Sequence, residues 1–421
     1  MRILWLKSDL LHPIDKGGKI RSYQMLRLLK RSCHITYLAM EDGTAGGDAK
    51  AQATEYCHEA LTVPHAMPEK FTAGFYGDLA KNLLSPLPYA VQKYRSSVYR
   101  RAVSEQLAGG GHDLLVCDFL FPAVNLPPRL PCPSVLFQHN VEALIWQRHV
   151  EAQTNPVARR YVELQRRRMD AFERAACRRF DCVVAVSAED RALMERLYGP
   201  PRVDDVPTGV DTDYFRPTGA PLRPHRLVFT GSMDWLPNDD AVRHFTQEIL
   251  PLVRREIPDV SLAVVGRKPF PRLVDLSRRD PHVIVTGRVD DVRPYIEEAA
   301  VYVVPIRIGG GTRLKVFEAM AMEKPVVSTS VGVEGLPVAH GEDVLVADDP
   351  REFARAVIRL LRDDGLARRL GQRAAAKVRR EFGWERAAGR FAEICARTVT
   401  DARTAAPRSE PVSVPPVRSA A

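Results

Sequence analysis

The sequence has no hydrophobic run long enough to cross a membrane, since no stretch approaches the about 20 apolar residues that a spanning helix requires. Its opening, MRILWLK, is interrupted by charge too early for a signal peptide. The seven cysteines are an odd number without CxxC spacing, which fits reduced thiols better than a disulfide framework or a zinc site. These absences favour a cytoplasmic protein, with peripheral contact at the inner membrane face left open.

Motifs of several functional classes are also missing. MRILWLKSDL lacks the GxGxxG expected after the first strand of a nicotinamide dehydrogenase. No HExxH or dense His/Asp cluster suggests a catalytic metal. Asp211 and Asp213 form a DxD, but within GVDTDYF such residues usually make turns and caps. No nucleic-acid-binding motif accompanies the basic charge. We therefore expect no cofactor, no metal and no nucleic acid.

The sequence does have enough apolar residues for two cores. It has 421 residues, 45% of them hydrophobic, with a formal net charge of +9 that favours anionic partners. Short apolar runs alternate with longer amphipathic segments, as in parallel sheets covered by helices. We expect an α/β fold with two doubly wound sheets, whose strands include 3–6, 35–38, 114–116, 135–137 and 182–186, then 227–230, 262–265, 283–285, 301–304, 326–328 and 344–346.

The expected organisation is two Rossmann-like domains, 1–205 and 227–380. A stretch dense in Pro, Gly and Asp, 206–226, reads as the linker. An amphipathic helix at 381–398 is expected to return to the first domain. The remainder, 399–421, has little apolar surface to bury and is expected to be disordered.

A glycine run in the second domain is the most informative segment. Gly309, Gly310 and Gly311 follow a buried strand and precede a helix starting near Thr312, where free backbone amides favour a phosphate. Lys315 and Glu318 share one face of that helix with Thr312, and Arg313 lies to its side. Lys315 suits a diphosphate and Glu318 suits ribose hydroxyls. The alternative is a turn with a Lys–Glu surface pair.

Two segments of the first domain are further candidates. In FQHNVEALIW, His139 follows a strand and precedes a helix that Asn140 could cap. Its imidazole could contact a substrate or make a structural hydrogen bond. The second segment is a loop with anion-friendly character or an ordinary tight turn, comprising Gly17, Gly18, Lys19 and Arg21.

A long basic helix is predicted over about 156–180. Its apolar face contains Val157, Tyr161, Leu164, Phe172 and Ala176, and its polar face contains Arg160, Arg167, Arg174 and Arg178. A solvated face is one interpretation, and contact with anionic lipid headgroups is the other.

The chain resembles glycosyltransferase family 4 from its start to about residue 398. The pieces that carry the resemblance are, in order, DKGGKIRS, QHNVE, VVAVSAEDRALM, PTGVDTDYF, FTGSMDWLPNDDAVRHF, VTGRVDDVRPYI and GGGTRLKVFEAMAMEKPVVST. The resemblance implies a GT-B fold with two domains facing a cleft, a nucleotide-sugar donor and metal-independent transfer with retention. The opening and SMDWLPN resemble transferases of bacterial exopolysaccharide and PEP-CTERM systems.

The resemblance also implies roles for individual residues. Glu318 matches the family's ribose-binding Glu, and His139 matches the first-domain His near the transferred sugar. The donor set is then Gly309–Arg313, Lys315 and Glu318, with Gly231, Arg288 and Val289. The loop containing Gly17 and Gly18 would line the acceptor side.

Three departures from the family pattern stand out. Gly310 occupies a position that is often Glu, eight residues before Glu318. The stretch GSMDWLPN lacks an Arg and a Lys found in many members. Glu323 stands where a Gly commonly ends the helix, and a left-handed residue there would cost about 1 kcal/mol.

The sequence thus predicts a glycosyltransferase that acts on a glycan or lipid-linked acceptor in cell-surface polysaccharide synthesis. A nucleotide-sugar epimerase of the same fold and a catalytically weak scaffold in a polysaccharide-assembly complex remain alternatives. The sequence does not identify the sugar, the base or the acceptor.

Overall fold

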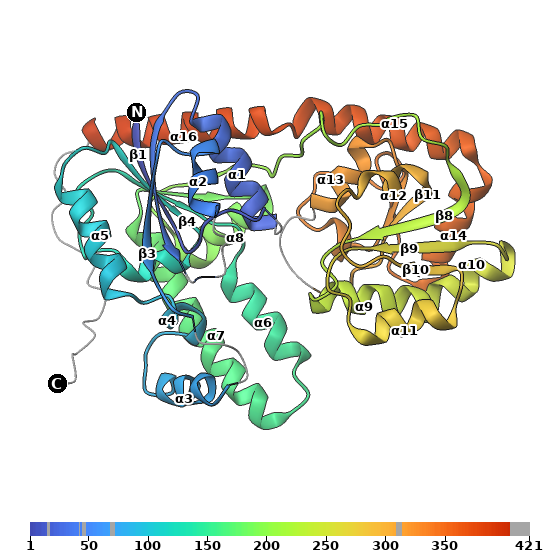
Figure 1. Cartoon of the computed structure of the whole chain (residues 1–421), viewed down its shortest axis with the longest axis horizontal. Helices are drawn as coiled ribbons and strands as arrows, with labels where there is room; N and C mark the ends of the chain where they lie inside the picture. Colours follow the sequence, from blue (N-terminus) through green and yellow to red (C-terminus); the bar gives the residue numbers. More distant parts are fainter. Residues whose placement is uncertain (15–16, 42, 44–47, 68–71, 309–313, 405–421) are drawn as a thin grey trace. The chain divides into compact units, whose positions relative to one another are not determined.

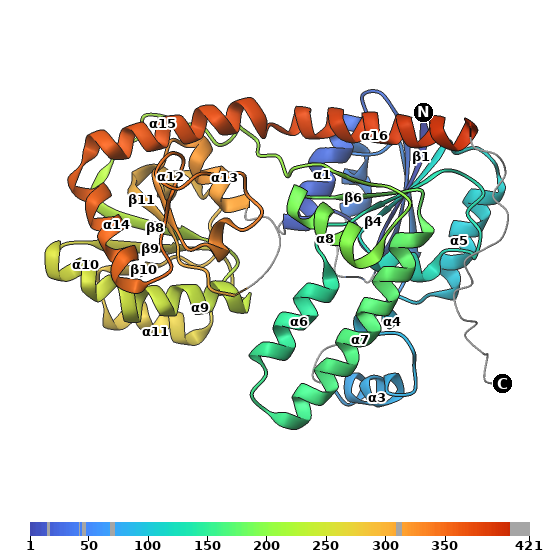
Figure 2. The same ribbon diagram turned by 180° about the vertical axis from the view of Figure 1, so that it is seen from behind.

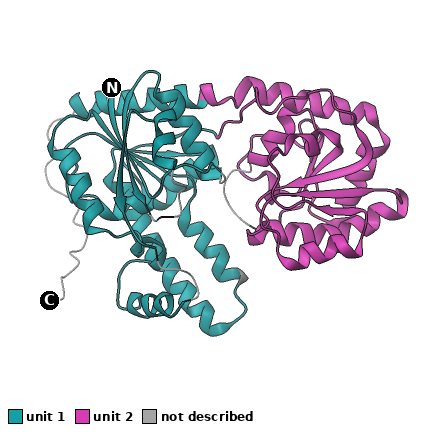
Figure 3. Cartoon of the chain, viewed as in Figure 1, with its two compact units in different colours: residues 1–207, 387–421 teal, residues 208–386 magenta. Residues whose placement is uncertain are grey.

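The computed structural model describes residues 1–14, 17–41, 43, 48–67, 72–308 and 314–404. The chain forms two compact units, shown in Figures 1, 2 and 3. Unit 1 comprises Met1–Pro207 and Ala387–Ala421, and unit 2 comprises Thr208–Arg386.

Unit 1 is built on a seven-stranded parallel sheet of order β3-β2-β1-β4-β5-β6-β7. Its strands are β1 (Arg2–Lys7), β2 (His34–Glu41), β3 (Glu59–Pro64), β4 (Leu114–Asp118), β5 (Ser134–Phe137), β6 (Cys182–Ala185) and β7 (Val203–Asp205). Its helices are α1 (Gly17–Leu29), α2 (Ala49–Gln52), α3 (Ala73–Asn82), α4 (Tyr89–Gln92), α5 (Ser97–Ala108), α6 (Glu142–Ala152), α7 (Pro156–Arg179), α8 (Ala188–Tyr198) and most of α16 (Trp384–Thr404).

Unit 2 has a six-stranded parallel sheet of order β10-β9-β8-β11-β12-β13. Its strands are β8 (Arg223–Thr230), β9 (Ser261–Val265), β10 (Val283–Val285), β11 (Ala299–Val304), β12 (Val326–Ser328) and β13 (Leu345–Val346). Its helices are α9 (Leu236–His244), α10 (Leu250–Glu256), α11 (Pro271–Arg279), α12 (Arg293–Glu298), α13 (Leu314–Ala321), α14 (Pro350–Arg362) and α15 (Asp364–Glu381). The predicted α/β class with two doubly wound parallel sheets is confirmed.

Each of the eleven predicted strands is present, and two further strands, β3 and β7, were missed. Both missed strands lie at an edge of the unit 1 sheet. Edge strands are covered less completely than central ones, so their sequences, EALTVP and VDD, carry polar residues and lack a continuous apolar run.

Several predicted boundaries differ from the structure. The strand β8 begins at Arg223, inside the predicted linker, because Arg223 pairs with Ala299 of β11. The last helix continues to Thr404 instead of ending at 398. Val399 is buried and Arg403 forms an ion pair with Asp113 at 3.0 Å, so the first part of the predicted tail packs on unit 1. Residues 405–421 lie outside the described residues.

The end of α13 has the left-handed residue that the sequence suggested. Glu323 has φ +59°. A Cβ added at Gly371 of α15 would lie 2.1 Å from the carbonyl oxygen of Glu323, so the glycine allows α15 to approach this turn. The close packing of α15 therefore accompanies a backbone conformation that costs about 1 kcal/mol or more for a residue with a side chain.

The basic helix α7 extends with α6 and α3 away from the unit 1 sheet (Figures 1 and 2). One feature of its prediction was wrong, because Val157 is 78% exposed and does not join the apolar face. On the predicted polar face, Arg160, Arg167 and Arg178 are exposed and Arg174 is partly exposed. Arg174 and Arg178 also donate to the carbonyl oxygens of Leu197 and Tyr198 at the end of α8.

Within the described part of the chain, no helix is both long and apolar enough to span a membrane. All seven cysteines are free, and six of them are buried. Asp211 accepts a hydrogen bond from the backbone N–H of Tyr214 at 3.0 Å, which is the turn-forming role expected for the DxD segment.

Candidate functional site

Of the predicted donor-binding residues, those that the structure describes lie at the carboxyl edge of the unit 2 sheet. Gly231 directly follows β8, and α13 begins at Leu314 after β11. In parallel sheets this edge carries ligand sites, because the loops that leave the strands converge there. The predicted phosphate turn, Gly309, Gly310, Gly311, Thr312 and Arg313, lies outside the described residues.

Lys315 is held in place on the first turn of α13. Its Nζ donates to Oδ1 of Asn238 at 2.8 Å and lies 4.2 Å from the centroid of the Phe229 ring. Asn238 is buried and its Nδ2 donates to the carbonyl oxygen of Ser232 at 2.8 Å. The ammonium group of Lys315 is thus held in one position beside the end of β8.

Gly231 leaves room for this arrangement. A Cβ at this position would lie 2.7 Å from both Lys315 Nζ and Asn238 Nδ2. The backbone there has φ +157°, near the limit of what residues with side chains adopt. A side chain at position 231 would therefore displace the ammonium group of Lys315.

Glu318 lies one turn after Lys315 on α13 and is half-buried. Burial raises the pKa of its carboxyl to about 7, and the nearby Lys315 ammonium opposes that rise. Tyr302, whose hydroxyl lies 2.5 Å from Thr230 Oγ1, also has a raised pKa through burial and the Glu318 charge. A carboxyl whose pKa is raised to near 7 beside a fixed cation is typical of a functional site.

Arg288 and Val289 follow β10 at the same edge of the same sheet. Arg288 is exposed, and Val289 packs partly against the unit 2 core. Both therefore lie on the loop that leaves β10, and their contact with a nucleobase stays a prediction. Among the described residues, neither Arg288 nor Val289 forms a hydrogen bond or ion pair with Lys315 or Glu318.

In unit 1, His139 belongs to a buried polar cluster at the carboxyl ends of β1 and β4. Lys7 Nζ and His139 Nε2 each lie 2.8 Å from Asp118 Oδ1. Ser22 and Trp5 donate to Asp118 Oδ2 at 2.6 and 3.0 Å. Burial alone would raise the pKa of Asp118, but the Lys7 ammonium and His139 outweigh it and hold that pKa well below its ordinary value.

The His139 imidazole is neutral at physiological pH. It is 2% exposed, and burial lowers its pKa to about 3; Asp118 opposes this shift, while Lys7 and Arg21 add to it. Its Nδ1 has no hydrogen-bond partner among the described residues. A Cβ at Gly18 would lie 3.5 Å from that nitrogen, so the start of α1 covers the ring.

The predicted acceptor-side loop is the first turn and a half of α1. Gly17 begins the helix, and Lys19 and Arg21 follow within it. Lys19 lies 3.4 Å from a carboxylate oxygen of Asp9. Arg21 is buried, which lowers its pKa to about 10, while Asp118 and Asp190 oppose the shift. Both cations have carboxylates of unit 1 as electrostatic neighbours, and the segment is helical instead of a solvated basic loop.

The prediction that Asn140 caps α6 was wrong. The residue at the N-cap is Val141, which makes no side-chain cap. The buried backbone N–H groups of Glu142 and Ala143, in the first turn of the helix, instead donate to the Glu173 carboxylate of α7, at 2.9 and 2.8 Å. A buried carboxylate 30 residues away thus replaces the expected local cap.

Sequence reasoning missed Asn238, Lys7 and Asp118. A weak signal was present for Asp118, because a charged residue ends the apolar run LLVCD, and for Lys7, which ends RILWLK. Asn238 lies in the first turn of a helix without any sequence motif, so only its contact with Lys315 shows that it belongs to the candidate site.

Two family models match separate parts of the chain. Residues 27–214 match the model described as glycosyltransferase family 4, and residues 224–363 match the one described as glycosyl transferases group 1.

Two curated relatives illustrate the similarity in sequence. A D-inositol 3-phosphate glycosyltransferase of Streptomyces bingchenggensis is 29% identical over 52% of this chain and 53% of its own length. A lipopolysaccharide core biosynthesis mannosyltransferase, LpcC, of Rhizobium leguminosarum is 25% identical over 59% of this chain and 74% of its own length. The chain spans about half the length of several of the curated relatives it matches.

Solved structures share the fold over nearly the whole chain. Sucrose-phosphate synthase from Thermosynechococcus elongatus superposes with a TM-score of 0.72 at 20% identity, covering 96% of this chain and 100% of the other. Anabaena HepE in complex with UDP-glucose does so with a TM-score of 0.64 at 14% identity, covering 94% and 100%. With the two α/β units and the two family matches, these findings show that the chain belongs to glycosyltransferase family 4 and has the GT-B fold.

Proposed function

We propose that this protein transfers a sugar, with retention and without a metal, from a nucleoside-diphosphate donor to a glycan or lipid-linked acceptor in cell-surface polysaccharide synthesis. The observation that carries the proposal is the arrangement of Lys315, Asn238 and Gly231 at the carboxyl edge of the unit 2 sheet. A fixed ammonium group beside Gly231 and on the first turn of α13 suits a diphosphate.

The donor would be bound by complementary groups on α13. Lys315 would neutralise the diphosphate, and its charge would stabilise the leaving group as the glycosidic bond breaks. Glu318, one turn further on, would accept hydrogen bonds from the ribose hydroxyls in its ionised form. Arg313 and the turn Gly309–Thr312 stay in the proposal as predicted diphosphate contacts. The structural relative HepE was solved with UDP-glucose, which supports a nucleotide-sugar donor.

His139 would position the transferred sugar from unit 1. Because its imidazole is neutral, it would act as a hydrogen-bonding group and not as a cation. Asp118 would be a positioning residue, since its Oδ1 lies 2.8 Å from His139 Nε2, and Lys7 would in turn hold Asp118. Gly18 adds no side chain over the ring, where a Cβ would lie 3.5 Å from Nδ1.

The acceptor proposal draws on the named relatives and on the surface of α7. One relative is a lipopolysaccharide core mannosyltransferase, so its acceptor class supports a glycan acceptor here. Arg160 and Arg167 are exposed and would contact anionic headgroups at the inner membrane face. Binding of the full chain to phosphatidylglycerol vesicles, compared with that of Arg160→Glu/Arg167→Glu, tests this part.

A transfer assay tests the function as a whole. The protein would be incubated with a panel of nucleotide sugars and a lipid-linked glycan fraction, and the released nucleotide and the anomeric configuration of the product would be followed by NMR. We expect nucleotide release that needs the acceptor, with the donor configuration kept. Release of a free epimerised sugar without acceptor, or an inverted product, would contradict the proposal.

A further inference from the structure

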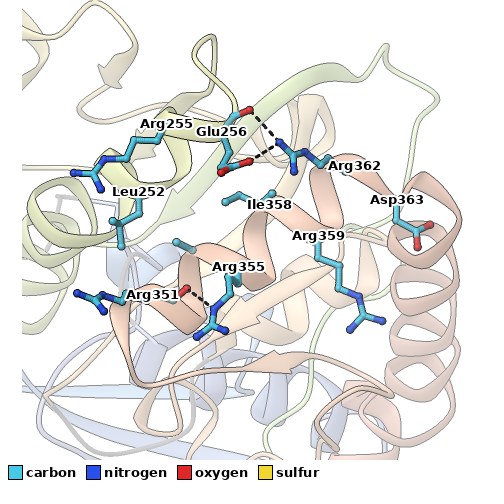
Figure 4. Close-up of a pocket in the computed structure, with 10 residues that line it drawn as sticks. Leu252, Arg255, Glu256, Arg351, Arg355, Ile358, Arg359, Arg362 and Asp363 are labelled. Atoms are coloured by element: carbon cyan, nitrogen blue, oxygen red, sulfur yellow. Dashed lines mark hydrogen bonds and ion pairs between the residues drawn. The ribbon is translucent and has the colours of Figure 1, made fainter.

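A pocket lies in unit 2 between α10 and α14, apart from the candidate donor site (Figure 4). Its volume is about 690 Å³, and none of its lining residues belongs to the candidate donor site. Five arginines surround it: Arg255 from α10, and Arg351, Arg355, Arg359 and Arg362 from α14.

The arginines outnumber the carboxylates available to them. Only two acidic residues line the pocket. Glu256 pairs with Arg362 at 2.8 Å, and Asp363 accepts from the backbone N–H of Leu366 and so caps α15.

Three of the arginines, Arg255, Arg351 and Arg359, form no ion pair with any described residue. Arg355 lies 4.0 Å from the exposed Glu352, which is a weak contact. The pocket therefore keeps a local excess of positive charge that suits an anionic ligand.

The arginines of α14 form a row. Arg351, Arg355 and Arg359 are four residues apart, so they follow one another along one face of the helix, as Figure 4 shows. The rise of an α-helix separates successive members by about 6 Å, so the row is about 12 Å long. A single phosphate would not reach its whole length, whereas a ligand with regularly repeated charges would.

The apolar residues that line the pocket limit the kinds of anionic ligand that it could bind. The pocket floor is formed by Leu252, Ile358 and Ala354, and no aromatic side chain lines it, which argues against stacked nucleobases. Leu252 and Ile358 are half-buried, so they do not protrude as membrane-inserting residues would. A chain of acidic sugars has apolar ring faces that could pack on Leu252 and Ile358. Its carboxylates could pair with the arginines.

We propose that the groove between α10 and α14 binds an acidic oligosaccharide, with carboxylates paired to the Arg351, Arg355 and Arg359 row and sugar rings resting on Leu252 and Ile358. The choice of a glycan among polyanions rests on the proposed sugar transfer. The site would hold a segment of an acidic acceptor or product chain away from the reacting sugar. Arginine forks bind carboxylates in two-point geometry, which suits this role.

Direct binding tests the proposal. The probe is a hexamer of galacturonic acid, titrated into the full chain at low ionic strength and followed by calorimetry, with neutral maltohexaose as the comparison. The test variant is Arg355→Glu/Arg359→Glu. The matched control is Arg100→Glu/Arg101→Glu, which changes the net charge equally on the exposed surface of α5. Circular dichroism and nucleotide binding report whether each variant is folded.

We expect the hexagalacturonate to bind the wild type and the control alike and to bind the test variant at least about tenfold more weakly, and maltohexaose not to bind. Equal loss in both double variants would mean nonspecific attraction and would overturn the proposal. The proposal would also be overturned if the protein bound phosphatidylglycerol vesicles through Arg355 and Arg359 but did not bind the oligosaccharide. Nucleotide binding is measured in a separate titration. A failure of the proposed donor site would appear in that titration, and the oligosaccharide titration would still test the groove between α10 and α14.

Discussion

Lys315 Nζ donates to Asn238 Oδ1 across 77 residues of sequence, and this 2.8 Å hydrogen bond ties the start of α13 to α9. Asn238 is neutral, so it orients the ammonium group without cancelling its charge. The cation therefore stays available to a diphosphate while its position is fixed. A carboxylate in the same place would hold the ammonium group equally well but neutralise it.

The substitution Asn238→Asp should separate position from charge. The two side chains have nearly the same shape, but the new carboxylate would form an ion pair with Lys315, and we expect about tenfold weaker binding of nucleoside diphosphates, or about 1.4 kcal/mol. Calorimetry measures it. The control is Asp240→Asn on the same helix, which breaks the exposed contact with Arg307. Unchanged affinity in Asn238→Asp would contradict a role for Lys315 in binding the diphosphate.

Nucleotide binding should depend on pH through Glu318. The ionised carboxylate accepts the ribose hydroxyls, and a pKa of about 7 means that its ionised fraction rises about tenfold between about pH 6 and about pH 8. Affinity for a nucleoside diphosphate should rise accordingly. In Glu318→Gln this component should vanish, leaving only the titration of the phosphate itself. A variant with the same pH profile as the wild type would show that Glu318 does not bind the donor.

Buried central strands could be predicted from the sequence because both of their faces are covered, which leaves continuous apolar runs. The edge strands β3 and β7 could not, because their residues are partly exposed. In the site, the spacing of Lys315 and Glu318 correctly indicated successive turns of one helix. The contact of Lys315 with Asn238, and that of Lys7 with Asp118 across 111 residues, depend on the tertiary fold and leave no local pattern.

The buried His139 should make the protein less stable in mild acid. Its pKa is about 3 in the folded protein, against 6.5 for an ordinary histidine. Below pH 6.5 the unfolded chain binds a proton that the folded chain does not, so the free energy of unfolding falls with pH, by about 2 kcal/mol between about pH 7 and about pH 5.

Urea unfolding of His139→Gln across that range measures the effect. Relative to the wild type, the variant should lose this part of the pH dependence. His149→Gln, which changes an exposed histidine of α6, should keep the wild-type dependence. An identical slope for His139→Gln and the wild type would mean that His139 is protonated in the folded state.

The end of α13 offers a stabilising substitution. Glu323 adopts φ +59°, where glycine is not strained, so Glu323→Gly should raise the free energy of unfolding by about 0.5–1 kcal/mol. The exposed pair with Arg379 that it removes contributes little. Glu323→Gln, which removes the pair but keeps the strain, is the control in the same urea experiment. A glycine variant no more stable than the glutamine variant would contradict a strained helix end.

The central claim is that unit 2 binds a nucleotide-sugar donor through α13. Calorimetric titration of the full chain with a panel of nucleoside diphosphates and nucleotide sugars, alongside Glu318→Ala, tests it most directly. We predict selective binding of one base, weakened at least about tenfold in the variant. Folded protein that binds no member of the panel, or that binds equally well without the Glu318 carboxylate, would contradict the donor site described above.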